Sequence, residues 1–230
     1  MRGGEAGLGA RGPGGRDLGD ESLGPFRVWD EEGTASVTSV VGTASRRVLV
    51  GVTGGIAAYK TAYVVSALVQ AGQDVRVVMS EAATRFVTPL TFETLSGQAV
   101  HTSLWEQRAA HHSAHIELAR SAEVVVIAPA SANTIAKIAH GVCDNLLTTV
   151  VCALPREPAA TPVVFAPAMN AEMWSNPMTR RNAAVLREDL GYEQVGPDEG
   201  WQACRTGGAG RMAEPEAIVD AAMRRLGVVA

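Results

Sequence analysis

Val48-Leu-Val-Gly-Val52 is a continuous apolar run of strand length, and Thr53-Gly54-Gly55 follow it directly. Residues 56–71 then carry apolar side chains at helical spacing, and residues 74–79 are the next predicted strand. A strand, a helix and a strand in this order predict a βαβ unit with two parallel strands. Backbone N–H groups at the start of the helix can bind an anion, and glycine lets the anion come close. The candidate phosphate ligands are Gly54, Gly55 and Ile56.

The glycine turn favours a mononucleotide over a dinucleotide as its ligand, because it lacks the full G-x-G-x-x-G fingerprint of dinucleotide-binding folds. Ser80 closes the second strand at the same edge of the sheet. Its hydroxyl can meet a phosphate there, or it can cap a helix over residues 81–86. For the glycines, the alternative is a tight strand–helix turn that binds no ligand.

Strands and helices alternate along the rest of the chain. Residues 88–96 are expected to be irregular and then helical. Further strands are expected at residues 123–128, 161–165 and 191–195. Further helices are expected at residues 135–140, 145–154, 176–189 and 214–226. This alternation predicts a single α/β domain with a doubly wound parallel sheet.

Residues 129–134 form a polar loop after the predicted strand at 123–128. Open α/β sheets bind ligands beyond the carboxyl ends of their strands, so a cofactor is expected beside this loop. Short polar side chains in the loop can hold a phosphate or the carbonyl groups of a ring. They are Ser131, Asn133 and Thr134.

Ala166-Pro-Ala-Met-Asn-Ala-Glu-Met-Trp174 follows the predicted strand at 161–165. It presents Asn170 just past the carboxyl end of that strand, and an amide donor there suits a substrate carboxylate. The side chains expected to form an apolar wall beside it are Met169, Met173 and Trp174. The alternative is that Asn170 only caps a helix that begins near Ala171.

Two further features stand out by position. Residues 196–212 form a glycine-rich segment that contains Trp201 and Cys204, and it is long enough to be a functional flap. His115 opens a patterned segment, residues 115–119, just before a predicted strand, so it is a candidate site residue. The other three histidines of the cluster at residues 101–115 can be ordinary surface residues. They are His101, His111 and His112.

Composition excludes several classes of protein. The 230 residues carry a net charge of −4 with a pI near 5.8, which gives no reason to expect a nucleic-acid partner. No apolar run reaches the roughly 18–20 residues that a membrane span needs. The cysteines are odd in number and lack metal-ligand spacing, so we expect a reduced, cytoplasmic protein without a metal. They are Cys143, Cys152 and Cys204.

Residues 1–45 differ in composition from the rest of the chain. The first 24 are rich in glycine with interspersed charges and can bury almost nothing. We expect residues 1–45 to be a disordered or loosely docked arm, and residues 46–230 to be the folded domain.

Four separated stretches together resemble motifs of the homo-oligomeric flavin-containing cysteine decarboxylases. They are Thr53-Gly-Gly-Ile-Ala-Ala58, His115-Ile-Glu-Leu118, Ala128-Pro-Ala-Ser-Ala-Asn-Thr134 and Pro167-Ala-Met-Asn-Ala-Glu-Met-Trp174. Cys204 with Gly207-Gly-Ala-Gly-Arg-Met212 resembles the substrate flap of the phosphopantothenoylcysteine decarboxylase branch. The resemblance covers about residues 46–226 in one order. The family also contains decarboxylases that act on the C-terminal cysteine of ribosomal peptides.

The resemblance implies FMN as the cofactor, so that residues 46–230 would be an FMN-binding flavoprotein decarboxylase domain with a flavodoxin/Rossmann-like doubly wound sheet. It also implies trimers that assemble further, expected as a dodecamer, with the flavin at a subunit boundary. It implies that His115 is the active-site histidine, Asn170 the carboxylate-binding asparagine and Cys204 the flap cysteine. The implied cofactor-binding residues are Gly54, Gly55, Ile56, Ser80, Ser131, Ala132, Asn133, Thr134 and Ala153. The implied substrate-binding residues are Met169, Met173, Trp174, Arg205, Arg211 and Met212.

The family's chemistry explains these residue types. Loss of CO₂ from cysteine needs an electron sink, and a flavin provides one by taking hydride from the CH₂ next to sulfur. The resulting thioaldehyde accepts the electrons as CO₂ departs and leaves an ene-thiol. His115 would remove the thiol proton or orient the substrate, and Asn170 would hold the carboxylate. If Cys204 then donates a proton while hydride returns, the product is the saturated thiol.

Two departures from the phosphopantothenoylcysteine branch favour a different substrate. Arg205-Thr206 follow the flap cysteine where that branch generally has Gly-Asp, and its bacterial members are usually fused to a ligase domain, whereas this chain ends at Ala230. We therefore expect oxidative decarboxylation of a peptide that ends in cysteine, giving an aminoenethiol. The alternatives are phosphopantothenoylcysteine decarboxylation for coenzyme A biosynthesis, which the presence of Cys204 favours, and a non-catalytic flavin-binding regulatory subunit.

Overall fold

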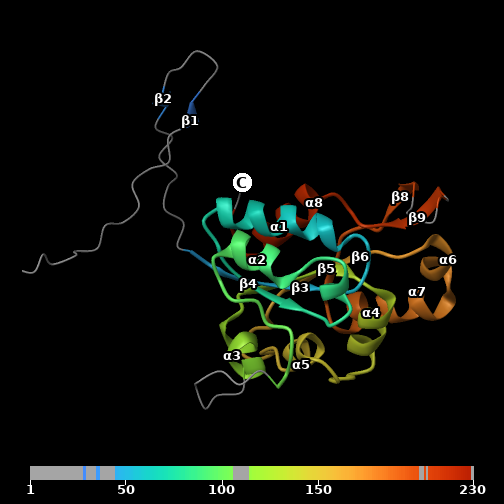
Figure 1. Ribbon diagram of the computed structural model, residues 1–230. Helices are drawn as coiled ribbons and strands as arrows, with labels where there is room; N and C mark the ends of the chain where they lie inside the picture. The colour runs from blue at the N-terminus through green and yellow to red at the C-terminus, as the bar shows by residue number, and fades with distance from the viewer. Residues whose placement is uncertain are drawn as a thin grey trace, which may run out of the picture. The chain divides into compact units, whose positions relative to one another are not determined.

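The computed structural model describes residues 28–29, 35–36, 45–105, 114–201, 205 and 207–228 (Figure 1). The chain divides into two units, Met1–Thr43 and Ala44–Ala230. In the first unit, strand β1 (Val28–Trp29) pairs antiparallel with β2 (Ala35–Ser36). Apart from these two strands, the arm predicted for residues 1–45 lies almost wholly outside the described residues.

A five-stranded parallel sheet organises the second unit. Its strands are β3 (Arg47–Val52), β4 (Asp74–Met79), β5 (Val124–Ala130), β6 (Val163–Pro167) and β7 (Glu193–Gln194). Their order across the sheet is β4-β3-β5-β6-β7. Counted along the chain this is the flavodoxin-like order 2-1-3-4-5, with the topological switch point between β3 and β5. The predicted fold class is confirmed.

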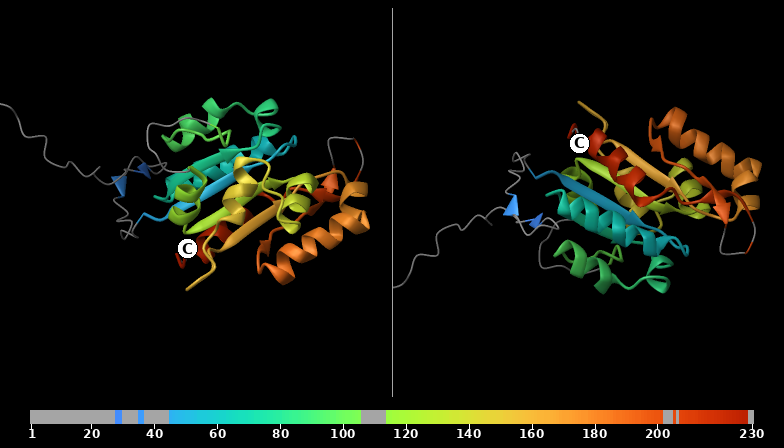
Figure 2. Two further views of the ribbon diagram at one scale, coloured as in Figure 1. Left: turned by 90° about the horizontal axis from the view of Figure 1, so that it is seen from below. Right: turned by 90° about the horizontal axis from the view of Figure 1, so that it is seen from above.

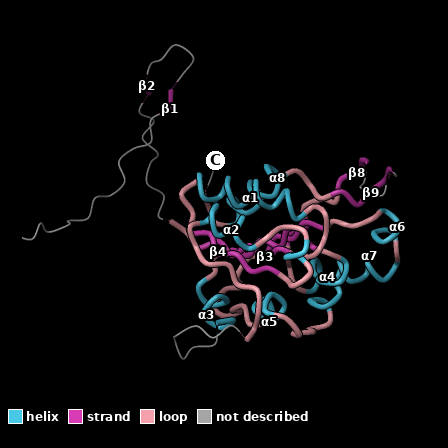
Figure 3. Tube along the Cα trace, in the orientation of Figure 1, coloured by secondary structure: helices cyan, strands magenta, loops and turns pink. Residues whose placement is uncertain are grey.

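Helices cover both faces of this sheet, as the tube in Figure 3 and the two views in Figure 2 show. One face carries α1 (Ala58–Gln70), α2 (Pro89–Ser96) and α8 (Pro215–Arg225). The other face carries α3 (Ala114–Ser121), α4 (Ala132–Ala139), α5 (Leu146–Cys152) and α7 (Pro177–Ala184). A short helix, α6 (Ala171–Ser175), joins β6 to α7.

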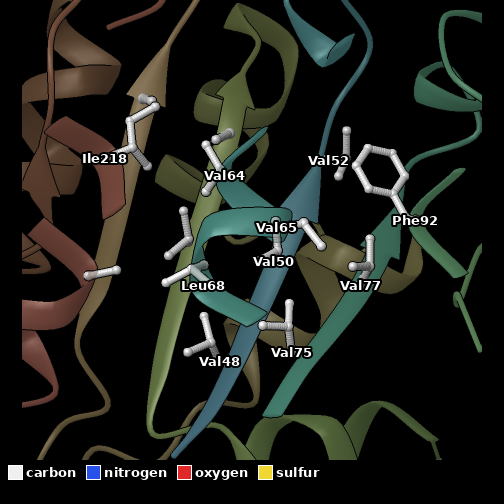
Figure 4. Close-up of a cluster of buried hydrophobic side chains, with 14 of the residues drawn as sticks. Val48, Val50, Val52, Val64, Val65, Leu68, Val75, Val77, Phe92 and Ile218 are labelled. Carbon is white, nitrogen blue, oxygen red and sulfur yellow. The ribbon is translucent and has the colours of Figure 1, made fainter. Parts of the chain in front are cut away.

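The alternation of side chains along β3 creates the two cores. Val48, Val50 and Val52 point to the α1 face, where they pack with Val64, Val65 and Leu68 (Figure 4). Leu49 points to the other face and packs in the cluster that includes residues of α4 and α5. All of these side chains are fully or almost fully buried. A strand that is buried on both faces has a continuous run of apolar residues, so the apolar run at residues 48–52 predicted β3 correctly.

The structure corrects the predicted helix at residues 81–86. Only a 3-10 turn, η1 (Ala83–Arg85), forms there, although the Ser80 hydroxyl accepts a hydrogen bond from the Ala83 N–H at 3.3 Å. Pro89 begins α2 three residues after Phe86, and the residue before a proline disfavours helical backbone angles, so a longer helix has no room. The predicted helix at 176–189 is divided in two. It begins as α7 and continues as a π-helical segment, η2 (Val185–Asp189).

The predicted loop at residues 196–212 is an antiparallel hairpin of β8 (Asp198–Trp201) and β9 (Gly207–Arg211). The sequence pattern did not predict strand β9, because its glycines leave no alternation of polar and apolar side chains. Gly208 is required by packing: a Cβ there would lie 2.8 Å from the Cβ of Ala171 in α6. The hairpin is thereby held directly against the Asn170 region.

The predicted polar loop at 129–134 is also corrected. Strand β5 extends through Ala130, with a register shift against β6 near Pro129, which has no N–H to donate to the ladder. Helix α4 begins at Ala132, so Ala132, Asn133 and Thr134 form its first turn. Within the described residues, none of the helices is long and apolar enough to cross a membrane.

Candidate functional site

The buried residue Thr53 links the ends of β3 and β5 at the topological switch point. Its hydroxyl donates a hydrogen bond to the Pro129 carbonyl at 2.6 Å and accepts one from the Ser131 N–H at 2.9 Å. Thr61 adds a second link, donating from its hydroxyl to the Ala128 carbonyl at 2.7 Å. These bonds fix the two loops on either side of the crevice in which such sheets bind ligands.

The predicted phosphate turn lies on one side of this crevice. A Cβ at Gly54 would lie 2.5 Å from the Cβ of Ala82, so the turn after β3 packs directly against the turn after β4. Gly55 faces open space, with no atom within 4 Å of a Cβ built there, and Ile56 is 59% exposed. Because Gly54 has no side chain, the backbone of the turn can approach both its neighbour and an anion.

Ser131 lies on the other side of the crevice as the N-cap of α4. Its Oγ accepts from the Thr134 N–H at 3.3 Å and lies 3.2 Å from the Thr134 hydroxyl. Ala132 and Asn133 lie beside them in the first turn of the helix, where N–H groups lack partners within the helix. Ala153 is elsewhere: it is the C-cap of α5 and packs against the core of the face that carries α4 and α5.

The donors around the crevice suit a phosphate. They are backbone N–H groups of a glycine turn, the N-terminus of α4, and the hydroxyls of Ser80, Ser131 and Thr134, which follow β4 and β5. None of the predicted cofactor-binding residues is acidic. Together with the open space at Gly55, this donor set fits the phosphate end of a mononucleotide.

A pocket of about 720 Å³ opens next to this turn. It lies between the start of α1, the loop after β6 and the β8–β9 hairpin, and its size suits a small-molecule ligand. It is lined by Gly55, Ile56, Ala57, Tyr59, Lys60, Ala168, Met169, Asn170, Trp201, Arg205, Gly210, Arg211 and Met212. Predicted phosphate-turn residues and predicted substrate residues therefore meet in one cavity.

Asn170 caps α6, as the alternative interpretation of the sequence predicted, and it also lines the pocket. Its Oδ1 accepts hydrogen bonds from the N–H groups of Glu172 at 2.9 Å and Met173 at 3.4 Å, which caps α6. The loop is further fixed by the Met169 N–H, which donates to the Gly210 carbonyl at 2.9 Å. Because the cap holds the amide oxygen toward the helix, it also fixes the direction of the amide nitrogen, the atom that can donate to a carboxylate.

The predicted substrate residues are only partly brought together. Met169, Arg205, Arg211 and Met212 line the pocket with Asn170. Met173 and Trp174 do not line it. Trp174 instead packs into the core of the α4 and α7 face, and its ring lies 5.0 Å from the Arg180 guanidinium carbon. Met173 is half exposed on α6.

His115 lies apart from the pocket. It is half-buried in the first turn of α3, on the face of the sheet opposite α1, and Figure 1 draws α3 far from the β8–β9 hairpin. His101, expected to be exposed, is buried: its N–H donates to the Val77 carbonyl at 3.0 Å and its carbonyl accepts from Met79 at 2.8 Å, which extends the sheet edge. Cys204, His111 and His112 lie outside the described residues.

Sequence reasoning missed Lys60 and Glu214. Lys60 Nζ lies 3.0 Å from Glu214 Oε2, and an Arg211 terminal nitrogen lies 3.2 Å from Glu214 Oε1. The hydrogen bond from Lys60, followed by the charges of Lys60 and Arg211, lowers the pKa of Glu214. Lys60 follows Ile56 by four residues, so helical spacing could have placed it at the same edge.

Comparisons with known proteins bear on this arrangement. The model of the family described as Flavoprotein matches residues 38–227. The bifunctional coenzyme A biosynthesis protein CoaBC of Bacillus subtilis is 46% identical over 77% of this chain, which covers 42% of that protein. The chain thus spans less than half the length of the bifunctional relatives it matches. A probable phosphopantothenoylcysteine decarboxylase of Streptococcus mutans is 40% identical over 76% of this chain and 96% of its own length.

Solved structures agree with these relatives. A PPC decarboxylase mutant complexed with pantothenoylaminoethenethiol has a TM-score of 0.67 and 36% identity, covering 77% of this chain and 96% of its own. The FMN-dependent cysteine decarboxylase SpaF has a TM-score of 0.66 and 35% identity, covering 79% of this chain and 97% of its own. These likenesses also support FMN as the cofactor, for which the crevice at the β3–β5 switch point offers the donors described above. This chain belongs to the Flavoprotein family, within the group of flavin-containing cysteine decarboxylases.

Proposed function

We propose that the protein is an FMN-dependent decarboxylase of phosphopantothenoylcysteine. The observation that carries the proposal is that one pocket joins the phosphate turn at Gly55 to Asn170. Relatives named for this reaction support it, among them one whose length the chain covers almost completely. The comparisons thus favour the substrate that sequence reasoning ranked second, behind a cysteine-ended peptide.

FMN would be held at the β3–β5 switch point by the backbone of Gly54 and Gly55, by Ser80, and by Ser131 at the start of α4. When bound, it supplies an acceptor for the hydride that leaves the carbon next to sulfur. Thr53 serves this site indirectly, because it holds the Ser131 backbone in place.

Asn170 binds and orients the substrate in this proposal. Its amide nitrogen donates to the cysteine carboxylate, which holds the bond to CO₂ in one orientation during its cleavage. Cap formation by the amide oxygen fixes the rotamer, so little side-chain entropy is lost on binding. Met169 and Met212 provide the apolar surface that keeps water away from the departing CO₂.

His115 would reach this site from a second copy of the chain. In its own chain it does not line the pocket, and its helix α3 lies far from the β8–β9 hairpin that does (Figure 1), so a shared site needs a homo-oligomer such as the predicted trimer. Its imidazole would accept the substrate thiol proton. Cys204, on the flap between β8 and β9, would donate the proton that yields the saturated thiol.

A peptide ending in cysteine is the second candidate substrate. Arg205 favours it, since it replaces the compact glycine of the phosphopantothenoylcysteine branch in the flap. Among the solved structures, SpaF, named as an FMN-dependent cysteine decarboxylase, is 35% identical to this chain and the PPC decarboxylase mutant is 36% identical, so these structures alone do not separate the two candidates.

Mass spectrometry on both substrates in parallel tests the proposal. With phosphopantothenoylcysteine, FMN-loaded enzyme should release CO₂ alone, a loss of about 44 Da, because hydride returns to the product. Conversion of cysteine-ended peptides by a loss of about 46 Da, CO₂ and two hydrogens, with phosphopantothenoylcysteine untouched, would restore the peptide as the substrate.

A further inference from the structure

Cys143 and Cys152 lie at the two ends of helix α5, and the proposed mechanism uses neither of them. Cys143 lies in the loop after α4, two residues before the N-cap of α5, and Cys152 is the last residue of the helix. Both thiols are exposed, and among the described residues neither has a disulfide partner. Exposure is one condition for the oxidation of a thiol to a disulfide, and the proximity of a second thiol is the other.

The geometry of α5 brings the two thiols together. Cys143 Sγ lies 3.8 Å from the Thr148 carbonyl oxygen, so the side chain of Cys143 lies against the helix rather than away from it. Cys152 follows Thr148 by four residues, which places its side chain on the same face, one turn further on. Desolvation, followed by the hydrogen bond with the Cys152 thiol, raises the pKa of the Cys143 thiol. The two sulfur atoms are therefore direct neighbours.

The loop that carries Cys143 is held in place on both sides. Toward α5, the Thr149 hydroxyl donates a hydrogen bond to the Cys143 carbonyl at 3.2 Å. Toward α4, the Val142 N–H donates to the Lys137 carbonyl at 2.8 Å, and Lys137 Nζ lies 2.7 Å from Asp144 Oδ2. Because these contacts already order the backbone, bonding of the two sulfurs requires side-chain rotation and little further loss of chain entropy.

A bound metal ion explains this pair less well. Two thiolates supply only half of the four ligands that a structural zinc ion takes. The part of the chain that the structure describes has no group of three or more His, Cys, Asp or Glu side chains placed to bind a metal. Asp144, which follows Cys143 directly, pairs with Lys137. Two neighbouring thiols without further ligands are suited to two-electron redox chemistry.

We propose that Cys143 and Cys152 are a redox modification site that forms a disulfide within one chain when the protein meets a peroxide. One thiolate attacks hydrogen peroxide and breaks its O–O bond, which gives a sulfenic acid and, with a proton, water. The second thiol attacks the sulfenic sulfur, so the S–S bond forms and a second water leaves. The two sulfurs lose two electrons, which the peroxide accepts. A dithiol reductant reverses the change by thiol–disulfide exchange.

The disulfide has two consequences for the protein. It closes a short loop between residues 143 and 152, which restricts the unfolded chain and so stabilises the fold. It also removes both thiols from further oxidation to sulfinic acid, a step that thiol reductants do not reverse. The site is independent of the proposed function, because neither cysteine lines the pocket that contains Asn170.

The test uses the full-length, FMN-loaded chain in a Cys204→Ser background. The chain has three cysteines, so only Cys143 and Cys152 then remain. Hydrogen peroxide should lower the number of free thiols, counted after denaturation, from two per chain to none, with a mass loss of about 2 Da. Dithiothreitol should restore both thiols. The matched controls add Cys143→Ser or Cys152→Ser to this background, and each should gain oxygen, about 16 Da or more, instead of losing hydrogen.

The wild type provides two further readouts. Trypsin leaves both cysteines in one peptide, residues 138–156, so the internal disulfide appears as that peptide about 2 Da lighter and resistant to alkylation. The oxidised protein should also unfold at a temperature about 5–10 °C above that of the reduced protein, as expected for a short closed loop. Peroxide should not raise the unfolding temperature of the Cys143→Ser or Cys152→Ser variant.

Three results would overturn the inference. Addition of oxygen to both sulfurs without loss of two hydrogens would mean that the two thiols do not meet. Disulfide-linked dimers in non-reducing electrophoresis would mean that the thiols pair between copies of the chain. An oxidised protein that unfolds at a lower temperature than the reduced protein would mean that the loop is not arranged for this bond.

Discussion

The Thr53 hydroxyl lies 2.9 Å from the Ser131 backbone nitrogen, although the two residues are 78 positions apart in the chain. The same hydroxyl donates to the Pro129 carbonyl, so one buried side chain joins the ends of β3 and β5. Two loops that border the flavin crevice therefore depend on one hydroxyl group for their spacing. Thr53 acts as a positioning residue in this arrangement.

Thr53→Val should weaken both folding and flavin retention. The substitution keeps the shape of the side chain but leaves the Pro129 carbonyl and the Ser131 N–H without their partner, at a cost of about 1–3 kcal/mol. Urea denaturation and flavin absorbance after dialysis measure the two effects. Thr53→Ser restores the hydroxyl and should retain FMN. Full flavin retention by Thr53→Val would show that the crevice does not need this link.

Asn170→Asp should separate the two roles of this residue. An aspartate oxygen can accept the same N–H groups of Glu172 and Met173, so α6 stays capped. The second oxygen replaces the amide donor and repels a substrate carboxylate, so turnover should fall by about 10²–10³, as for loss of a donor at a reacting anion. CO₂ release is compared at equal flavin occupancy. Asn170→Ala should instead lose about 1 kcal/mol of stability with the cap.

The local sequence pattern predicted the βαβ unit correctly. The features that it did not predict depend on contacts between residues that are far apart in the chain. The apolar run of β3 and the helical spacing of α1 are properties of neighbouring residues, and the structure reproduces both. Strand β9 consists of glycines, alanine and arginine, so its pairing with β8 leaves no periodic trace. The predicted wall was only partly right: Met169 lines the pocket, but α6 directs Trp174 into the opposite core.

Lowering the pH should reduce the stability of the fold by protonating Asp74 at the edge of the sheet. Burial alone would raise the pKa of Asp74, but hydrogen bonds from Arg47 at 2.9 Å and Arg76 at 3.3 Å outweigh it, and the pKa lies below its ordinary value. A carboxylate whose pKa is lowered on folding stabilises the native state above its unfolded pKa, near 3.9, and loses this effect as the pH falls through the folded pKa.

Asp74→Asn is the variant that checks this pH dependence. At pH 7 it should lower the free energy of unfolding by about 1 kcal/mol, the range of a partly exposed ion pair. Below pH 4 the difference from the wild type should shrink toward zero. Urea denaturation from pH 3 to pH 7 measures both. A difference that stays constant across this range would mean that ionisation of Asp74 does not stabilise the fold.

Mixed oligomers should regain the activity that two single variants lose. His115→Asn and Asn170→Asp each remove one proposed catalytic group, and in one chain Asn170 lines the pocket while His115 lies apart from it in α3. If a site takes His115 from one copy and Asn170 from another, random mixing leaves about a quarter of the sites intact. Co-expression of the two chains in equal amounts gives the random mixture, whose CO₂ release is compared per bound flavin without separating the species.

A control mixture makes the result decisive. Wild type mixed with the His115→Asn/Asn170→Asp double variant should also give about a quarter of full activity if the site is shared, but about half if each site lies within one chain. The two single variants would then give none. Shared sites thus predict equal activity in both mixtures, and sites within one chain predict activity only in the control. The first result would place the pocket at an interface between copies. The second would require the flap or α3 to move until His115 reaches Asn170 of its own chain.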